Sequence, residues 1–190
     1  MKKQPEITDA TREAFISAFF QLAKIKNINQ ITIREITNLA GYNRTTFYRY
    51  FEDVFALMEY AEDQFLQRTN EAVEAQLGWN QIGEKQFFQI LIRCFQENKD
   101  RVSILLSEQN RSHFLRRLKE NLTNNIYIRD NDTPRKSVVR DIYFYGIFYA
   151  ISINLQNKNA LSDEDLLELI QKLFENWYRP EILENTEFYS

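Results

Sequence analysis

Residues 32–51 read TIREITNLAGYNRTTFYRYF, and this stretch carries the start and stop signals of two short helices. Thr32, with Glu35 three residues later, forms a capping box, which predicts a first helix over residues 33–40. Gly41 stands directly after that helix, where a residue in the left-handed conformation would end it. The local signals therefore define the first helix at both of its ends.

A second helix, residues 44–50, is predicted after a three-residue turn, because Asn43 can cap it. Two short helices joined in this way have the dimensions of a helix-turn-helix unit. At about 100° per residue, Phe47 and Phe51 fall on the side that packs inward. The opposite side offers guanidinium, hydroxyl and phenol groups without a carboxylate, which is the chemistry that suits a DNA groove. An ordinary solvated face would mix glutamate with lysine, and residues 44–50 contain neither.

Helical spacing of apolar residues and capping signals predict an all-α chain of about nine helices, without an alternation long enough for a strand. Gly78 and Gly83 bracket a linker. We expect a helix-turn-helix domain over residues 1–53, a connecting helix over 54–77 and a second helical domain over 78–190. The other helices are expected at residues 9–26, 84–98, 101–107, 110–127, 135–157 and 163–178.

Composition indicates a soluble globular protein, with 190 residues, 44% hydrophobic and 27% charged. Cys94 is the one cysteine, which excludes an internal disulfide and favours a reducing compartment. The charged N-terminus lacks the apolar region of a signal peptide. The most apolar run, residues 142–155, is shorter than the roughly 20 residues that a membrane-spanning helix needs. We therefore expect a cytoplasmic protein without a membrane segment.

Charge is distributed unevenly along the chain, whose net charge is −3. Residues 1–51 hold eight Lys or Arg and four Asp or Glu, so that the acidic excess belongs to the remainder. A basic front on an acidic body favours a polyanionic partner for the front. Chance variation among solvated charges is the alternative, and charge alone does not exclude it.

Residues 32–51 resemble the DNA-binding domain of the TetR family of bacterial repressors. The matching features are the capped helix that ends in Ala40 and Gly41, and the run of Thr46, Phe47, Tyr48 and Phe51 after the turn. The resemblance covers about the first 75 residues. It implies phosphate contacts for Thr32 and Tyr48. It implies contacts with bases or with the DNA backbone for Arg34, Arg44, Thr45, Thr46, Arg49 and Tyr50. The predicted DNA-binding residues are Thr32, Arg34, Asn43, Arg44, Thr45, Thr46, Tyr48, Arg49 and Tyr50.

One position departs from the family pattern. Val54 stands where the family often carries a phosphate-binding lysine, and Glu52 and Asp53 add negative charge beside it. With one phosphate contact fewer, the affinity for DNA should depend less steeply on salt.

The predicted helices 135–157 and 163–178 are rich in apolar residues. A chain of this size can hardly cover both, so that a monomer with a large core is the weaker alternative to a dimer. In TetR-like proteins the last two long helices form a four-helix dimer interface, and a two-fold dimer would read a palindrome. By the same resemblance we expect a ligand pocket between the helices from about 84 to 155. Candidate lining residues are Phe87, Leu91, Phe95, Phe114, Tyr143 and Tyr149, with Arg93, Asn110 or His113 as polar anchors.

The function that we expect is a dimeric, ligand-responsive transcriptional repressor that binds a palindromic operator in double-stranded DNA. A TetR-like protein that acts mainly through a protein partner, such as a coactivator, is the second hypothesis. A helical enzyme is the third and weakest, because the chain lacks a glycine-rich phosphate loop and has one histidine, His113. With one histidine and one cysteine we expect no His/Cys metal site and no cofactor.

Overall fold

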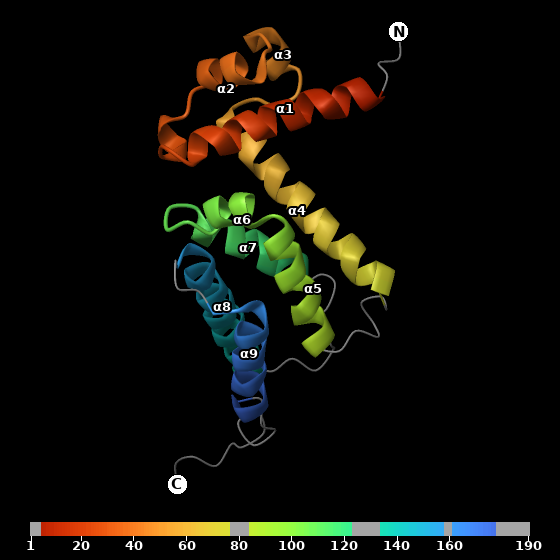
Figure 1. Ribbon diagram of the computed structural model, residues 1–190, viewed down its shortest axis with the longest axis vertical. Coiled ribbons are helices and arrows are strands. Elements are labelled where there is room, and N and C mark those ends of the chain that lie inside the picture. The colour runs from red at the N-terminus through yellow and green to blue at the C-terminus, as the bar shows by residue number, and fades with distance from the viewer. Residues whose placement is uncertain (1–4, 77–83, 123–133, 158–160, 178–190) are drawn as a thin grey trace. The chain divides into compact units, whose positions relative to one another are not determined.

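The computed structural model describes residues 5–76, 84–122, 134–157 and 161–177 (Figure 1). These residues contain α-helices and one short 3-10 helix, and no strand occurs among them. The all-α prediction is confirmed. The helices are α1 (Pro5–Ala23), η1 (Ile28–Gln30), α2 (Ile33–Ala40), α3 (Arg44–Tyr48), α4 (Val54–Gln76), α5 (Glu84–Glu97), α6 (Lys99–Leu105), α7 (Arg111–Leu122), α8 (Pro134–Gln156) and α9 (Asp163–Trp177).

Two compact units make up the chain, residues 1–67 and 68–190, and the division between them falls within α4. None of the helices in the described ranges has both the length and the apolarity needed to cross a membrane. Within those ranges, no three His, Cys, Asp or Glu side chains gather in a way that could hold a metal ion.

The ends of α2 and α3 follow the predicted signals. The Thr32 hydroxyl accepts a hydrogen bond from the Glu35 N–H, and the Glu35 carboxylate accepts one from the Thr32 N–H, so that the capping box is complete. Gly41 ends α2 with φ 76°, a left-handed conformation that suits a residue without Cβ. Asn43 caps α3 through its side chain. The helix-turn-helix unit is thus specified by short-range contacts.

An aromatic cluster forms the core of the first unit. Phe15 of α1 is fully buried, and its ring centroid lies 5.3 Å from those of both Tyr42 and Phe47 and 6.3 Å from that of Phe51. Phe47 is fully buried as well, and its ring centroid lies 5.6 Å from that of Phe51. The prediction that Phe47 and Phe51 face inward is confirmed. Their packing against α1 fixes how α3 is rotated about its axis.

The apolar side of α2 is narrower than helical spacing suggests. Ile36 is fully buried, whereas Leu39 is 49% exposed although it follows Ile36 by three residues. Thr37 is buried instead, and its hydroxyl donates to the Arg34 carbonyl at 3.1 Å. This bond satisfies the hydroxyl, so that a polar side chain can take a core position.

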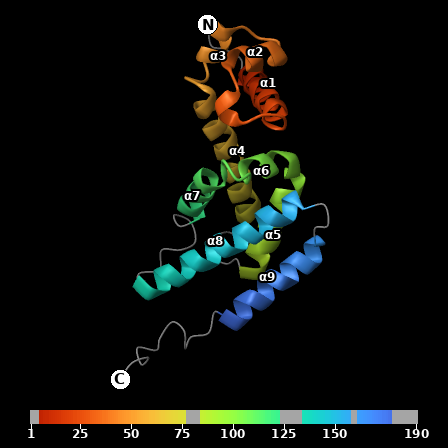
Figure 2. The ribbon, with the colours of Figure 1, turned by 90° about the vertical axis from the view of Figure 1, so that its left-hand side faces the viewer.

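In the second unit, α5 packs against α6 and α9, and α8 packs against α6 and α7. Figure 2 shows α8 and α9 running in opposite directions. The Leu161 N–H donates to Asn154 Oδ1 at 2.7 Å, and Asn154 Nδ2 donates to the Leu161 carbonyl at 3.2 Å, which joins the end of α8 to the segment before α9. Ser162 then caps α9 by accepting from the Asp165 N–H at 3.1 Å.

Candidate nucleic-acid interface

The exposed side of α3 carries the arginine and hydroxyl groups that the sequence singles out. Arg44, Thr45 and Arg49 are exposed, and Tyr48 is half exposed. Phe47, on the opposite side of the same helix, is buried in the aromatic cluster. Because Phe47 fixes the rotation of α3, these four side chains are held outward together.

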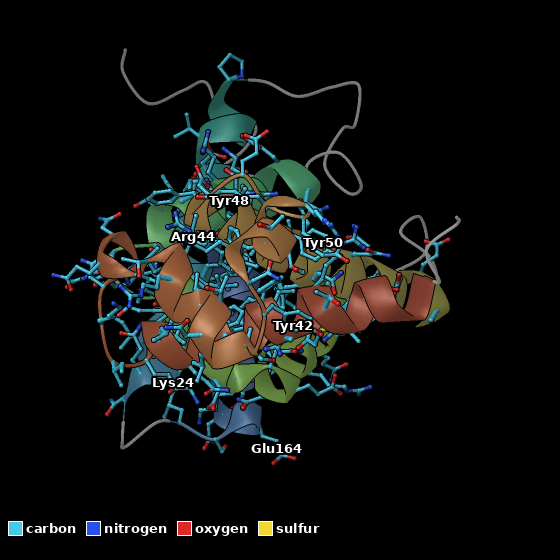
Figure 3. All side chains as sticks on the ribbon, turned by 90° about the horizontal axis from the view of Figure 1, so that it is seen from above. Lys24, Tyr42, Arg44, Tyr48, Tyr50 and Glu164 are labelled. Atoms are coloured by element: carbon cyan, nitrogen blue, oxygen red, sulfur yellow. The ribbon has the colours of Figure 1, made fainter. Side chains whose placement is uncertain are left out.

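Arg44 and Tyr48 contact each other on this surface (Figure 3). Arg44 Nη2 donates to the Tyr48 hydroxyl at 3.3 Å, and the guanidinium carbon lies 6.0 Å from the centroid of the Tyr48 ring. The Tyr48 ring in turn stands edge-on to Phe47, with centroids 5.9 Å apart. A chain of contacts therefore connects the exposed guanidinium to the buried core.

Asn43 and Thr46 bond to each other at the start of α3. Asn43 Oδ1 accepts from the Thr46 N–H at 2.8 Å and from the Thr46 hydroxyl at 3.0 Å. The hydroxyl proton that Thr46 would give to a base or phosphate is thus engaged in the cap. We assign both residues first to the start of α3, and their predicted contact with DNA stays a prediction.

Substitutions of Asn43 can distinguish its role in capping α3 from its predicted role in DNA binding. Asn43→Ala should lower the free energy of unfolding by about 1 kcal/mol, because the Thr46 N–H loses its acceptor. Asn43→Asp keeps an acceptor and should remain within about 0.5 kcal/mol of wild type. The new carboxylate should nevertheless weaken DNA binding. Urea unfolding and fluorescence-anisotropy titration measure the two effects, and equal destabilisation by both variants would contradict the assignment.

Thr32 is part of a three-residue network at the start of α2. Its hydroxyl donates to Glu35 Oε2 at 2.7 Å, and Lys26 Nζ lies 2.6 Å from each oxygen of the same carboxylate. The lysine, the Thr32 hydroxyl and the Thr32 N–H lower the pKa of Glu35 from 4.5 to about 2. Lys26 stands just after α1, so that this network also ties the end of α1 to α2.

The lowered pKa of Glu35 predicts that its contribution to the free energy of unfolding decreases in acid. Because the pKa is lower in the folded chain, the contribution is complete above pH 4.5 and is lost as the pH falls toward 2. Glu35→Gln keeps a capping acceptor but removes the charge. The difference between the unfolding midpoints of wild type and Glu35→Gln should be constant above pH 5 and shrink below pH 4.5. A difference that does not change between pH 7 and pH 3 would contradict the network.

Tyr50 is half-buried beside the aromatic cluster. Its ring centroid lies 6.4 Å from that of Phe15 and 6.3 Å from that of Phe51. The Arg12 guanidinium lies 5.4 Å from the Tyr50 ring centroid and 5.5 Å from that of Tyr60. Arg12 thereby links α1, the segment after α3 and α4. Arg12 carries no local signal in the sequence, because these contacts join residues 38 and 48 positions apart.

The start of α4 lacks a basic side chain. Val54 is buried, so that its side chain belongs to the core of the first unit. Asp53 accepts from the Ala56 N–H at 2.8 Å, and Glu52 and Asp53 are exposed. The surface here is acidic, in contrast to the surface of α3. Arg34 of α2 is exposed and is the remaining predicted contact.

The predicted ligand-lining residues fall into three groups. Leu91, Phe95 and Phe114 are buried in the second unit, and His113 is half-buried. Tyr149 is exposed, with the Arg111 guanidinium 4.7 Å from its ring centroid. The side chains of Phe87 and Tyr143 lie outside the described residues. Of the polar anchors, Arg93 is exposed, and Asn110 donates to Ile104 O and Ser107 Oγ.

Three solved structures are similar to this fold. A TetR transcriptional regulator from Streptococcus agalactiae 2603V has a TM-score of 0.68 at 19% identity, with 90% of this chain and 98% of that chain covered. The dihydroxyacetone kinase operon activator DhaS has a TM-score of 0.59 at 19% identity, with 88% and 93% covered. The fatty acid degradation regulator FadR from Bacillus halodurans has a TM-score of 0.58 at 15% identity, with 100% of both chains covered.

No protein-family model and no curated protein matches the sequence. The likeness to the solved regulators extends along nearly the whole chain. The chain therefore has the TetR-like fold.

Proposed function

We propose that the protein is a dimeric DNA-binding transcriptional regulator that binds a palindromic operator. The observation that carries the proposal is the outward face of α3, where Arg44, Thr45 and Arg49 are exposed and no carboxylate occurs between residues 43 and 50. Guanidinium and hydroxyl groups pair with phosphates and base edges. The first unit would bind DNA, and the second would serve dimerisation and regulation.

A stripe of exposed apolar residues on α8 supports the dimer. Its members recur at spacings of three or four residues, so that they lie on one side of the helix, and each is 41 to 59% exposed. Contiguous exposed apolar surface of this kind marks interaction sites. We propose that two copies pack through this α8 stripe and α9 about a two-fold axis. The α8 stripe consists of Val138, Ile142, Tyr145, Tyr149 and Ile153.

The proposal includes regulation by a small-molecule effector. Such a ligand would bind in the second unit, near Leu91, Phe95 and Phe114, and would favour an arrangement of the dimer that does not fit the operator. Binding would then relieve repression. Because coupling is reciprocal, operator DNA would weaken effector binding by the same factor.

A mobility-shift assay on the DNA upstream of the protein's own gene tests the proposal. Wild type should shift this DNA specifically against excess random competitor. The Arg44→Ala/Arg49→Ala double variant should lose the specific shift, whereas Arg116→Ala, which removes an exposed arginine of α7, should retain it. A wild type that prefers no palindrome over random DNA, even at low salt, would exclude the proposal.

The second candidate is a TetR-like protein that acts mainly through a protein partner. The exposed Glu52 and Asp53 and the buried Val54 favour it, because they replace a basic phosphate contact with acidic surface. Co-purification of one partner in equal amount, together with weak DNA binding that wild type and the double arginine variant share, would support this alternative.

A further inference from the structure

The surface formed by residues 43–50 has many hydrogen-bond donors and few acceptors. From Asn43 to Tyr50 it offers two arginines and no carboxylate. Its one amide oxygen, Asn43 Oδ1, already accepts two hydrogen bonds from Thr46. The two arginines, which only donate, are therefore the exposed groups of α3 that can form paired hydrogen bonds with a base edge, beside single hydroxyls that donate or accept.

The paired N–H donors of an arginine select among the four bases in the major groove. Adenine presents an acceptor beside a donor, and its usual partner is an Asn or Gln amide that both donates and accepts. Cytosine presents a donor, which calls for a carboxylate. Guanine presents two adjacent acceptors, N7 and O6, which match the paired N–H groups of an arginine. With the Asn43 oxygen occupied, guanine is the base that fits this surface.

Arg44 is the better placed of the two arginines on α3. Its guanidinium is held by the Tyr48 hydroxyl at 3.3 Å and lies over the Tyr48 ring. Arginine has five N–H donors, so that this bond leaves enough for a paired contact with a base. A guanidinium that is already held loses less conformational freedom on binding. Arg49 stands after the end of α3 and has no comparable contact among the described residues.

We propose that Arg44 reads a guanine in each half of the operator, and that Tyr48 is a positioning residue that holds the Arg44 guanidinium for this contact. The inference rests on the proposed function, because it names the base that the proposed interface selects. Thr45, exposed beside Arg44, would contact the neighbouring base through its hydroxyl or methyl group.

The test removes one acceptor atom from the DNA. A palindrome is first selected from a random pool with wild-type protein, and each half-site guanine is then replaced in turn by 7-deazaguanine, which lacks N7. At one guanine per half-site, this replacement should weaken binding on the order of tenfold. Replacement of adenines by 7-deazaadenine is the matched control and should change affinity less than about twofold.

Protein variants assign the effect to a residue through a double-mutant cycle. In Arg44→Ala, the loss caused by 7-deazaguanine should fall below about twofold, because no contact with N7 remains to be broken. In Arg49→Ala the tenfold loss should persist. In Tyr48→Phe, which keeps the ring and removes the hydroxyl, the loss should be smaller than in wild type.

Each contrary result overturns a defined part of the inference. A palindrome that binds equally well with 7-deazaguanine would exclude guanine reading and leave the proposed function intact. A loss that persists in Arg44→Ala but disappears in Arg49→Ala would reassign the reader. An unchanged loss in Tyr48→Phe would remove the positioning role. If no palindrome can be selected at all, the proposed function fails, and the inference fails with it.

Discussion

Replacing Phe47 by alanine is expected to lower the free energy of unfolding of the first unit by about 3–5 kcal/mol. The side chain is fully buried, and its ring contacts those of Phe15, Tyr48 and Phe51. Alanine would leave a cavity at the point where α3 is fixed to α1. DNA binding should be lost together with stability, because the rotation of α3 depends on this ring.

The matched control is Phe55→Ala, which removes an equal ring that is 51% exposed at the start of α4. It should lower the free energy of unfolding by less than about 1 kcal/mol. Urea unfolding followed by circular dichroism measures both variants, and hydrogen exchange locates the loss within residues 5–67. Similar losses in the two variants would show that Phe47 does not anchor the unit.

Replacing Ile142 by glutamate is expected to convert the proposed dimer into a monomer. Ile142 is 56% exposed within one chain, so that the variant should fold normally. In the proposed dimer its side chain is covered by the second copy, and a buried carboxylate without a partner costs several kcal/mol. The dissociation constant of the dimer should therefore rise by about 100-fold or more.

Gln89→Glu is the control, since it introduces the same charge at an exposed position of α5. Sedimentation equilibrium over a range of concentrations compares the two variants with wild type. Gln89→Glu should dissociate as wild type does. An Ile142→Glu variant that dimerises as tightly as wild type would exclude the α8 stripe from the interface.

The helix-turn-helix unit could be predicted closely because its signals are local. The Thr32–Glu35 capping box, the left-handed Gly41 and the Asn43 cap each depend on residues within three positions of one another. The helical phase of Phe47 follows from the same boundaries. Such short-range signals do not require knowledge of the tertiary structure.

Features that depend on tertiary contacts are harder to predict from the sequence. The predicted second helix ran to residue 50, whereas α3 ends at Tyr48, and the ring of Tyr50 meets Arg12 of α1. The bond between Lys26 and Glu35 spans nine residues and joins two elements. Neither contact produces a recognisable sequence pattern, because the packing of the helices determines which residues meet.

Spacing alone does not show how exposed an apolar side chain is. Leu39 continues the apolar pattern of α2 but is exposed, since the short helix buries Ile36 and Thr37 instead. Tyr149 was predicted to line a ligand pocket, and it lies on the exposed α8 stripe under the guanidinium of Arg111. When a helix is apolar on most sides, its sequence does not show which side remains exposed to solvent.

We propose that this chain recognises DNA by sequence. Such recognition is measured by the ratio of dissociation constants for a scrambled duplex and for the selected palindrome, obtained by anisotropy at about 150 mM salt. The ratio should be on the order of 10³ or more for wild type and close to one for Arg44→Ala/Arg49→Ala. A wild-type ratio close to one at both 50 and 150 mM salt would contradict it.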